Sequence, residues 1–250
     1  MKNIIVQIYE IQTPYEAEMV IELGVDHIGS VILSEETWKV PQIRETISLA
    51  ESTDSLTSLI PLLGNPDNIF RSLDYYRPDI IHFCEALANR ENVFKECEEL
   101  KRFQEDVKKR FPEISIMRSV PIAPPGKGDA FPSIEAAKIF EPASDYFLTD
   151  TLLVNESKLA SDDQPVIGFV GITGQTCDWD VAAKLVESSS IPVILAGGIS
   201  SDNVSDSILH VRPAGVDSCT ATNAVDPEGR PIRFKKDPEK VRFFVEAAKG

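Results

Sequence analysis

Val193-Ile194-Leu195-Ala196-Gly197-Gly198-Ile199 is an apolar run that contains two adjacent glycines near its end. The polar residues 200–203 follow it, and then come the apolar positions Val204, Ile208 and Leu209. This order predicts a buried strand, a tight glycine turn, and a helix whose capped N-terminus starts at the turn. Such a turn exposes backbone N–H groups beside the positive end of a helix dipole, which favours a bound anion such as phosphate. The alternative is that the glycines only make a tight strand-to-helix turn.

The same strand-then-helix order runs along the whole chain. Thr13-Pro14-Tyr15-Glu16 is a capping box with proline at the first helical position, and Asp237-Pro238 begins the last helix in a similar way. The expected strands are residues 4–8, 25–33, 56–63, 79–84, 114–120, 145–148, the opening segment and 215–219. The expected helices are residues 14–24, 41–51, 66–76, 92–110, 133–140 (capped by Ser133), 179–186, the helix after Gly198 and the helix after Asp237.

Eight such units imply parallel strands joined by helical crossovers. In 250 residues they favour a closed (β/α)8 TIM barrel that occupies residues 1–250 as a single domain. An open, doubly wound parallel sheet is the alternative fold. We expect the active site at the C-terminal ends of the strands, where the loops after strands five, six and eight are long.

The composition excludes several kinds of partner. The net charge of −15 argues against nucleic acid and anionic membranes, and no apolar run approaches the length that spans a bilayer. The N-terminus lacks the layout of a signal peptide, so we expect a cytoplasmic protein with reduced thiols. The three histidines have no metal-binding spacing, so we expect no metal site.

Residues 171–179 read Gly-Ile-Thr-Gly-Gln-Thr-Cys-Asp-Trp. This segment resembles the Gly-Gly-Thr-Gly-x-Thr-Phe-Asp-Trp loop of the phosphoribosylanthranilate isomerases. Residues 193–198 resemble that family's seventh strand and glycine turn, and residues 215–217 and 236–241 resemble its eighth strand and last helix. The resemblance implies a (β/α)8 barrel whose loops after strands six, seven and eight hold a substrate phosphate. It also implies an Amadori rearrangement of a phosphorylated aminoaldose, by a general acid and a general base, without a cofactor.

The resemblance assigns roles to several residues. Asp150, in Tyr146-Phe147-Leu148-Thr149-Asp150-Thr151, matches the family's general acid, and a loop or helix cap is its structural alternative. Asp217 matches the aspartate of strand eight that contacts the anthranilate side of the substrate. The candidate phosphate-binding residues are Gly174, Gln175, Gly197, Gly198, Thr220 and Ala221.

Other positions depart from the family. Its Lys-x-Cys-Gly, which ends strand one with the catalytic cysteine, is replaced by Gln7-Ile8-Tyr9-Glu10. A phenol is a poor base at pH 7, so Glu10 and Asp217 are the candidate bases. The family's Ser-Pro-Arg-Tyr-Val loop becomes residues 36–40 without an arginine, and Ala221 stands where a glycine approaches the phosphate.

Two further charged groups are candidates for the site. Arg118 lies in the fifth strand, and a guanidinium inside a barrel needs an anionic partner, which is either an internal carboxylate or a ligand. Glu10 and Glu85 both follow barrel strands and could share acid and base work.

We therefore predict an isomerase-like enzyme (an intramolecular oxidoreductase) or a lyase that acts on a small phosphorylated sugar or related phosphometabolite. Asp150, Glu10, Asp217 and Arg118 are its candidate catalytic residues. Because the cysteine base is replaced, we expect little activity on phosphoribosylanthranilate itself. The alternative is a non-catalytic barrel that binds a phosphometabolite or a protein. A homodimer is possible. The sequence does not identify the organic part of the substrate.

Overall fold

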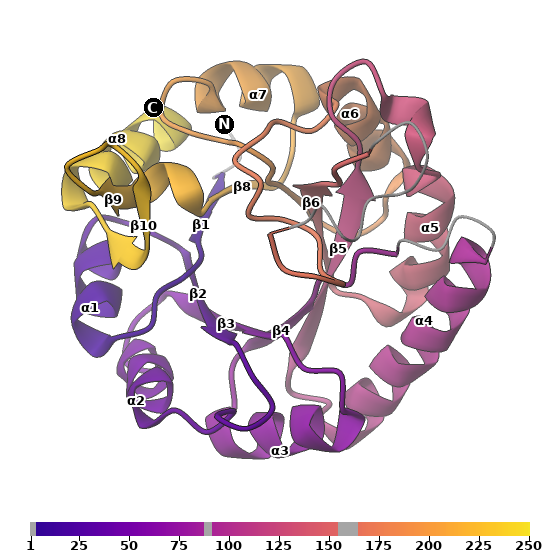
Figure 1. Ribbon diagram of the computed structural model, residues 1–250, viewed down its shortest axis with the longest axis horizontal. Helices are drawn as coiled ribbons and strands as arrows, with labels where there is room; N and C mark the ends of the chain where they lie inside the picture. Colours follow the sequence, from indigo (N-terminus) through magenta and orange to yellow (C-terminus); the bar gives the residue numbers. More distant parts are fainter. Residues whose placement is uncertain (1–3, 88–91, 155–164) are drawn as a thin grey trace.

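The computed structural model describes residues 4–87, 92–154 and 165–250, and its strands form a ring surrounded by helices (Figure 1). The barrel strands are β1 (Ile5–Ile8), β2 (His27–Ile32), β3 (Leu56–Pro61), β4 (Ile80–Phe83), β5 (Ser115–Ile122), β6 (Tyr146–Thr151), β7 (Val193–Leu195) and β8 (Gly215–Ser218). The helices are α1 (Pro14–Glu22), α2 (Pro41–Ala50), α3 (Pro66–Tyr76), α4 (Val93–Arg110), α5 (Ser133–Phe140), α6 (Trp179–Ser188), α7 (Val204–Val211) and α8 (Pro238–Lys249). Short 3-10 helices lie at Gly128–Ala130, Glu141–Ala143 and Thr220–Thr222.

The eight strands close into a barrel, because β1 pairs in parallel with both β2 and β8. Ile5 pairs with Gly215 on one side of β1, and Gln7 pairs with His27 on the other. This closure confirms the (β/α)8 barrel, and the doubly wound open sheet is wrong.

Alternate strand residues fill the two sides of the barrel wall. Tyr9, Met117, Leu148 and Ile194 belong to a buried cluster drawn from strands around the barrel, which packs its interior. The intervening strand residues pack against the surrounding helices, as Phe147 does in the cluster that contains Phe140 of α5.

The helix after the double glycine begins later than expected. Residues 200–203 form a turn, and α7 starts at Val204. The Asn203 side chain reaches back, accepting from the Ser200 N–H (2.9 Å) and donating to the Gly198 carbonyl (3.0 Å). The expectation of a helix N-terminus directly at the turn is therefore wrong, since Asn203 braces the turn instead of capping the helix. Ser133 likewise is the first residue of α5, not its cap, and its hydroxyl donates to the Pro121 carbonyl.

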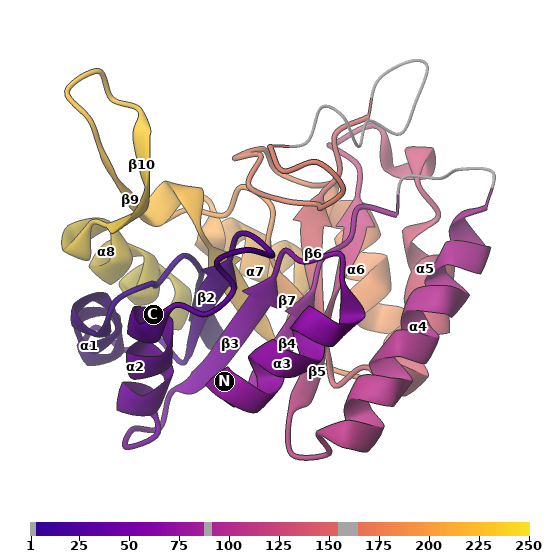
Figure 2. The same ribbon diagram turned by 60° about the horizontal axis from the view of Figure 1, so that its bottom comes forward.

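An antiparallel hairpin of β9 (Asn223–Val225) and β10 (Pro231–Lys236) lies between β8 and α8, and the sequence had not indicated it. The hairpin extends beyond the C-terminal ends of the barrel strands (Figure 2). Within the described part of the chain, no helix has the length and apolar character to cross a membrane.

Candidate active site

Two aspartates face the same space at the C-terminal end of the barrel. Asp150 comes from the end of β6 and Asp217 from β8, and both line a cavity of about 410 Å³. They also line a smaller and more apolar cavity of about 60 Å³ beside it. The two aspartates are therefore shared between the large cavity and the small cavity.

Burial makes both aspartates weak acids. Burial raises the pKa of Asp150 to about 7. The hydrogen bond that the Thr151 backbone N–H donates to the Asp150 carboxylate lowers this pKa by a smaller amount. Burial, followed by the charge of Asp150, raises the pKa of Asp217 to about 8, while a hydrogen bond from Gln7 and the Lys236 charge oppose the rise. Near neutral pH the pair can therefore hold a single proton, which allows one carboxyl to act as an acid and the other as a base.

The loop after β6 lies against Asp150. Backbone hydrogen bonds from Val170 to the Cys84 carbonyl and from Ala86 to the Gly168 carbonyl fasten it to the end of β4. Gly171 then passes against the Asp150 carboxylate, where a Cβ atom would collide with Oδ2. The glycine at position 171 thus allows the loop to lie directly against the Asp150 carboxyl.

The two glycines after β7 shape the wall of the large cavity. Gly197 and Gly198 have φ of 90° and 62°, and a Cβ on Gly198 would lie 2.6 Å from the Gln175 carbonyl carbon. Glycine is needed there because the two loops touch backbone to backbone. The large cavity is lined by most of the predicted phosphate-binding residues, which are Gly174, Gly197, Gly198, Thr220 and Ala221.

Gln175 does not line that cavity. Its carbonyl accepts from the Thr151 hydroxyl (2.6 Å) and its N–H donates to the Thr173 hydroxyl (3.2 Å), so it braces the loop. Lys240 lines the cavity instead, and its Nζ donates to the Asn223 carbonyl (2.9 Å). One feature of the sequence could have indicated Lys240. A positive charge in the first turn of a helix is unfavourable beside the positive end of the helix dipole, so a lysine there suggests a binding role.

Tyr9, at the position of the family's cysteine, is held in a buried polar network. Its hydroxyl bonds with Ser58 Oγ (2.5 Å) and His82 Nδ1 (2.7 Å), and His82 Nε2 bonds with Ser119 Oγ (2.8 Å). Burial raises the pKa of Tyr9 well above 10 and lowers the pKa of His82 to about 3. Both side chains are therefore neutral at pH 7, and Tyr9 cannot act as a base there.

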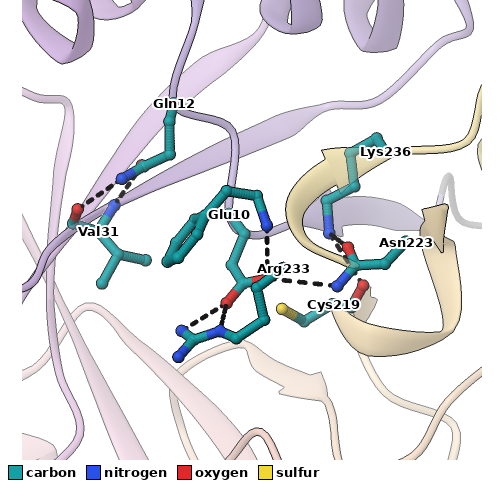
Figure 3. A network of polar contacts seen from close by, with 8 residues as sticks. Glu10, Gln12, Val31, Cys219, Asn223, Arg233 and Lys236 are labelled. Atoms are coloured by element: carbon teal, nitrogen blue, oxygen red, sulfur yellow. Dashed lines mark hydrogen bonds and ion pairs between the residues drawn. The ribbon is translucent and has the colours of Figure 1, made fainter. Parts of the chain in front are cut away.

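Glu10 lies at the end of β1 and lines the small cavity, but it is already paired. Its Oε1 lies 2.6 Å from Arg233 Nη2, on the β9–β10 hairpin, and Asn223 Nδ2 donates to its Oε2 (3.3 Å) (Figure 3). The Glu10 side chain is 2% exposed and that of Arg233 is 39% exposed. This ion pair supports a structural role for Glu10 in joining the hairpin to the barrel.

Arg118 faces away from the barrel mouth. Its guanidinium lies over the Phe140 ring of α5 (4.2 Å to the centroid), and Nη1 forms an ion pair with Glu85 Oε2 (2.5 Å). The neighbours Met117 and Ser119 take the interior positions, so the alternation of the strand turns Arg118 outward. The expectation that Arg118 lies inside the barrel is wrong, and its anionic partner is Glu85.

Two residues hold a left-handed backbone where the resembling family has glycine. Glu10 has φ of 67° and Ile172 has φ of 61°. This conformation is costly for a β-branched residue such as Ile172, and it persists where the surroundings enforce it. Ile172 lines both cavities, so its strained backbone places an isoleucine side chain directly at the site.

The cysteines that line the site are thiols with raised pKa values. Burial raises the pKa of Cys84 and of Cys219, which line the small cavity. Among the residues that the structure describes, no group of three His, Cys, Asp or Glu side chains could hold a metal ion. The chemistry that these residues can supply is proton transfer by Asp150 and Asp217.

Comparisons with known proteins point to one family. The family model of N-(5'phosphoribosyl)anthranilate (PRA) isomerase matches residues 133–247. The N-(5'-phosphoribosyl)anthranilate isomerase of Methanothrix thermoacetophila is 28% identical over 242 residues, which cover 96% of this chain and 95% of that relative. N-(5'-phosphoribosyl)anthranilate isomerase 2 of Methanosarcina mazei is 38% identical over 144 residues, which cover 58% of this chain and 53% of the relative. The phosphoribosyl anthranilate isomerase structure from Thermotoga maritima matches with a TM-score of 0.70 at 19% identity and covers 99% of both chains.

Proposed function

Because this chain belongs to the phosphoribosylanthranilate isomerase family, we propose that it isomerises a phosphorylated aldose or aminoaldose to the corresponding ketose. The observation that carries the proposal is that two carboxyls with raised pKa values line the same cavity as the double-glycine turn. Such a reaction needs acid–base groups and a binding site for the phosphate, and a glycine turn with exposed backbone N–H groups is suited to bind an anion.

The reaction moves a proton between two neighbouring carbons. For an aminoaldose, an acid protonates the ring oxygen as the C1–O bond breaks, and a base then removes the C2 proton to give an enolamine. Protonation of C1 and loss of the proton from the C2 hydroxyl then give the ketose. Asp150 is the acid, in agreement with its place in the family's strand-six pattern. Asp217 is then the base. This assignment requires the protonation state in which Asp150 carries the proton and Asp217 is ionised.

Asp217 takes the base role because the other candidates are occupied. Tyr9 is a neutral phenol inside a hydrogen-bond network, and Glu10 is paired with Arg233. Asp217 is buried, and Gln7 Nε2 donates to its Oδ1 (3.2 Å), which fixes the orientation of the carboxyl. Gly171 of the loop after β6 lies against the Asp150 carboxyl, and Asp217 is buried, so electrostatic interactions of both carboxyls are stronger than in water.

The substrate phosphate is assigned to the large cavity. Gly197, Gly198 and Ser200 present a turn there, Thr220 adds a hydroxyl, and Lys240 supplies a positive charge. A phosphate in this place leaves the carbon chain of the substrate to extend toward Asp150 and Asp217.

The proposal is tested by incubating the purified protein with a panel of phosphorylated aldoses and aldosylamines, including phosphoribosylanthranilate, and measuring ketose formation. We expect a ketose from at least one member and none from its unphosphorylated counterpart. Inorganic phosphate should also raise the melting temperature, because a ligand that binds only the folded state stabilises it. Stabilisation by phosphorylated compounds without any turnover would instead favour a binding barrel.

A further inference from the structure

We infer that Gln7 and His27 are positioning residues for the base: His27 holds the side-chain amide of Gln7, and that amide donates to Asp217 and favours the ionised form of its carboxyl. The inference rests on the proposed function, in which ionised Asp217 removes the proton from C2. It follows from two consecutive hydrogen bonds inside the barrel, from the direction in which each must run, and from the burial of all three side chains.

The three side chains form one row across neighbouring strands. Gln7 of β1 pairs in register with His27 of β2 on one side and with Asp217 of β8 on the other. All three residues are buried. The Gln7 amide reaches both neighbours, because its Oε1 lies 3.2 Å from His27 Nδ1 and its Nε2 lies 3.2 Å from Asp217 Oδ1. Gln7 therefore links the imidazole to the carboxyl.

The direction of each hydrogen bond follows from the chemistry of the groups. An amide oxygen only accepts, so His27 Nδ1 carries a hydrogen and donates to Gln7. Burial lowers the pKa of His27 to about 4, so the ring is neutral at pH 7 and Nδ1 holds its single hydrogen. The amide nitrogen of Gln7 then donates to Asp217. A donor beside a carboxyl stabilises its ionised form.

Rotation of the Gln7 amide by 180° would have the opposite effect. Its oxygen would then accept a hydrogen from protonated Asp217, and its nitrogen would need an acceptor at His27 Nδ1. The hydrogen on His27 Nδ1 disfavours that arrangement, because it would face an N–H group. His27 therefore acts on the base through Gln7, and the sign of the effect on Asp217 distinguishes the two orientations of the amide.

Other titratable groups also act on Asp217. Among the described residues, the charge of Asp150 on β6 raises the pKa of Asp217, and the charge of Lys236 on β10 lowers it. The remaining titratable groups that line either cavity with Asp217 are Tyr9, Glu10, His82, Cys84, Cys219 and Lys240. Since replacement of Gln7 or His27 removes none of these groups, a comparison of variants isolates the hydrogen bond.

The test measures the ionisation of Asp217 directly. The ¹³Cγ signal of Asp217, identified by its absence in Asp217→Asn, is titrated by NMR in protein that carries Asp150→Asn, so that Asp217 titrates without its carboxyl partner. Gln7→Met keeps the length of the side chain and removes its N–H groups. We expect this substitution to raise the pKa of Asp217 by at least about one pH unit, because a hydrogen bond to a charged group is strong.

His27 is tested with and without Gln7. His27→Phe keeps the ring that packs edge-on against Tyr146 (5.8 Å between centroids) and removes the N–H, so we expect a smaller rise of the same sign. In the double variant we expect no rise beyond that of Gln7→Met, because His27 acts through Gln7. His27→Phe also keeps the test decisive if Gln7→Met does not fold.

Gln104→Met is the matched control. Gln104 of α4 is also buried, and its amide donates to the Ala143 carbonyl (3.1 Å) and to Ser144 Oγ (3.0 Å), so the substitution removes similar hydrogen bonds away from Asp217. We expect it to leave the pKa of Asp217 unchanged.

The pH dependence of turnover provides a second readout. With a substrate from the panel, Gln7→Met in otherwise wild-type protein should lower kcat/KM at least about tenfold at pH 6.5. The loss should become smaller as the pH rises, because Asp217 then ionises without the hydrogen bond. A purely structural role of Gln7 would lower kcat/KM equally at all pH values.

The outcomes separate the two proposals. An unchanged or lowered pKa of Asp217 in Gln7→Met, or an equal effect of His27→Phe with and without Gln7, would overturn the inference and leave the proposed isomerase intact. Absence of turnover with every substrate of the panel would overturn the proposed function. The role of Gln7 and His27 in the reaction would then fall with it, whatever the NMR titration gives.

Discussion

The carboxylate of Glu10 lies 2.6 Å from the guanidinium of Arg233, although the two residues are 223 positions apart in the chain. Glu10 is buried and holds a left-handed backbone, and Arg233 lies on the β9–β10 hairpin. This ion pair therefore connects the β9–β10 hairpin to the C-terminal end of the barrel beside the site.

Arg233→Ala should lower the free energy of unfolding more than Glu10→Gln does. Arg233→Ala leaves the Glu10 carboxylate buried without a cation, and we expect a loss of roughly 1–3 kcal/mol, since Arg233 is partly exposed. Glu10→Gln should cost less. Urea unfolding of both single variants and the double variant measures the coupling, and additive losses would contradict the role of the pair.

Asp150→Asn should remove turnover and keep phosphate binding. Asparagine preserves the shape of the side chain but cannot donate a proton as an acid, so we expect kcat/KM to fall about 10²–10⁴-fold. The phosphate is assigned to other loops, so the melting-temperature increase with inorganic phosphate should remain. Normal turnover by this variant would reduce Asp150 to a loop-capping residue.

Asp217→Asn should stabilise the protein increasingly as the pH rises. The pKa of Asp217 is raised from 3.8 to about 8, so the buried neutral carboxyl contributes stability below about pH 4 that is lost as the pH rises through 8. The asparagine side chain has no such loss, and the variant should gain up to about 5 kcal/mol relative to the wild type by pH 9. Chemical unfolding at pH 5, 7 and 9 checks this, with the exposed Asp202→Asn as a control.

Tyr9→Phe should lower stability and spare catalysis. The substitution removes the hydroxyl that bonds with Ser58 and His82, and an unpaired buried nitrogen on His82 costs about 1–3 kcal/mol. Because the neutral phenol is not the base, kcat/KM should change less than tenfold. A loss of a thousandfold or more, in a variant that remains folded, would make Tyr9 a participant in the reaction.

Much of the fold could be predicted from local signals. Pro66–Tyr76 has the predicted bounds of α3, and Asp178 and Asp237 cap α6 and α8, because prolines and capping side chains act within one helical turn. The β9–β10 hairpin was missed because β9 has only three residues and β10 begins at a proline, although Ile232 and Phe234 of β10 alternate with charged residues.

The candidate site was predictable where a residue's place along a strand decides its role. Asp150 and Asp217 lie near the C-terminal ends of β6 and β8, so their positions in the predicted strands place them at the mouth of the barrel. The roles of Arg118 and Glu10 could not be predicted from their places along the strands. Their partners, Glu85 and Arg233, are contributed by distant segments, and the face on which Arg118 lies depends on the strand register.

The most direct test of the Asp150–Asp217 mechanism is proton exchange during turnover. A phosphorylated aldosylamine that the protein converts to ketose is incubated in D₂O, and deuterium at C1 of the ketose is measured by NMR for the wild type, Asp150→Asn and Asp217→Asn. The account predicts a deuterated ketose from the wild type and a loss of at least about 100-fold in its rate of formation for each variant. Ketose formation at the wild-type rate by both variants would contradict it.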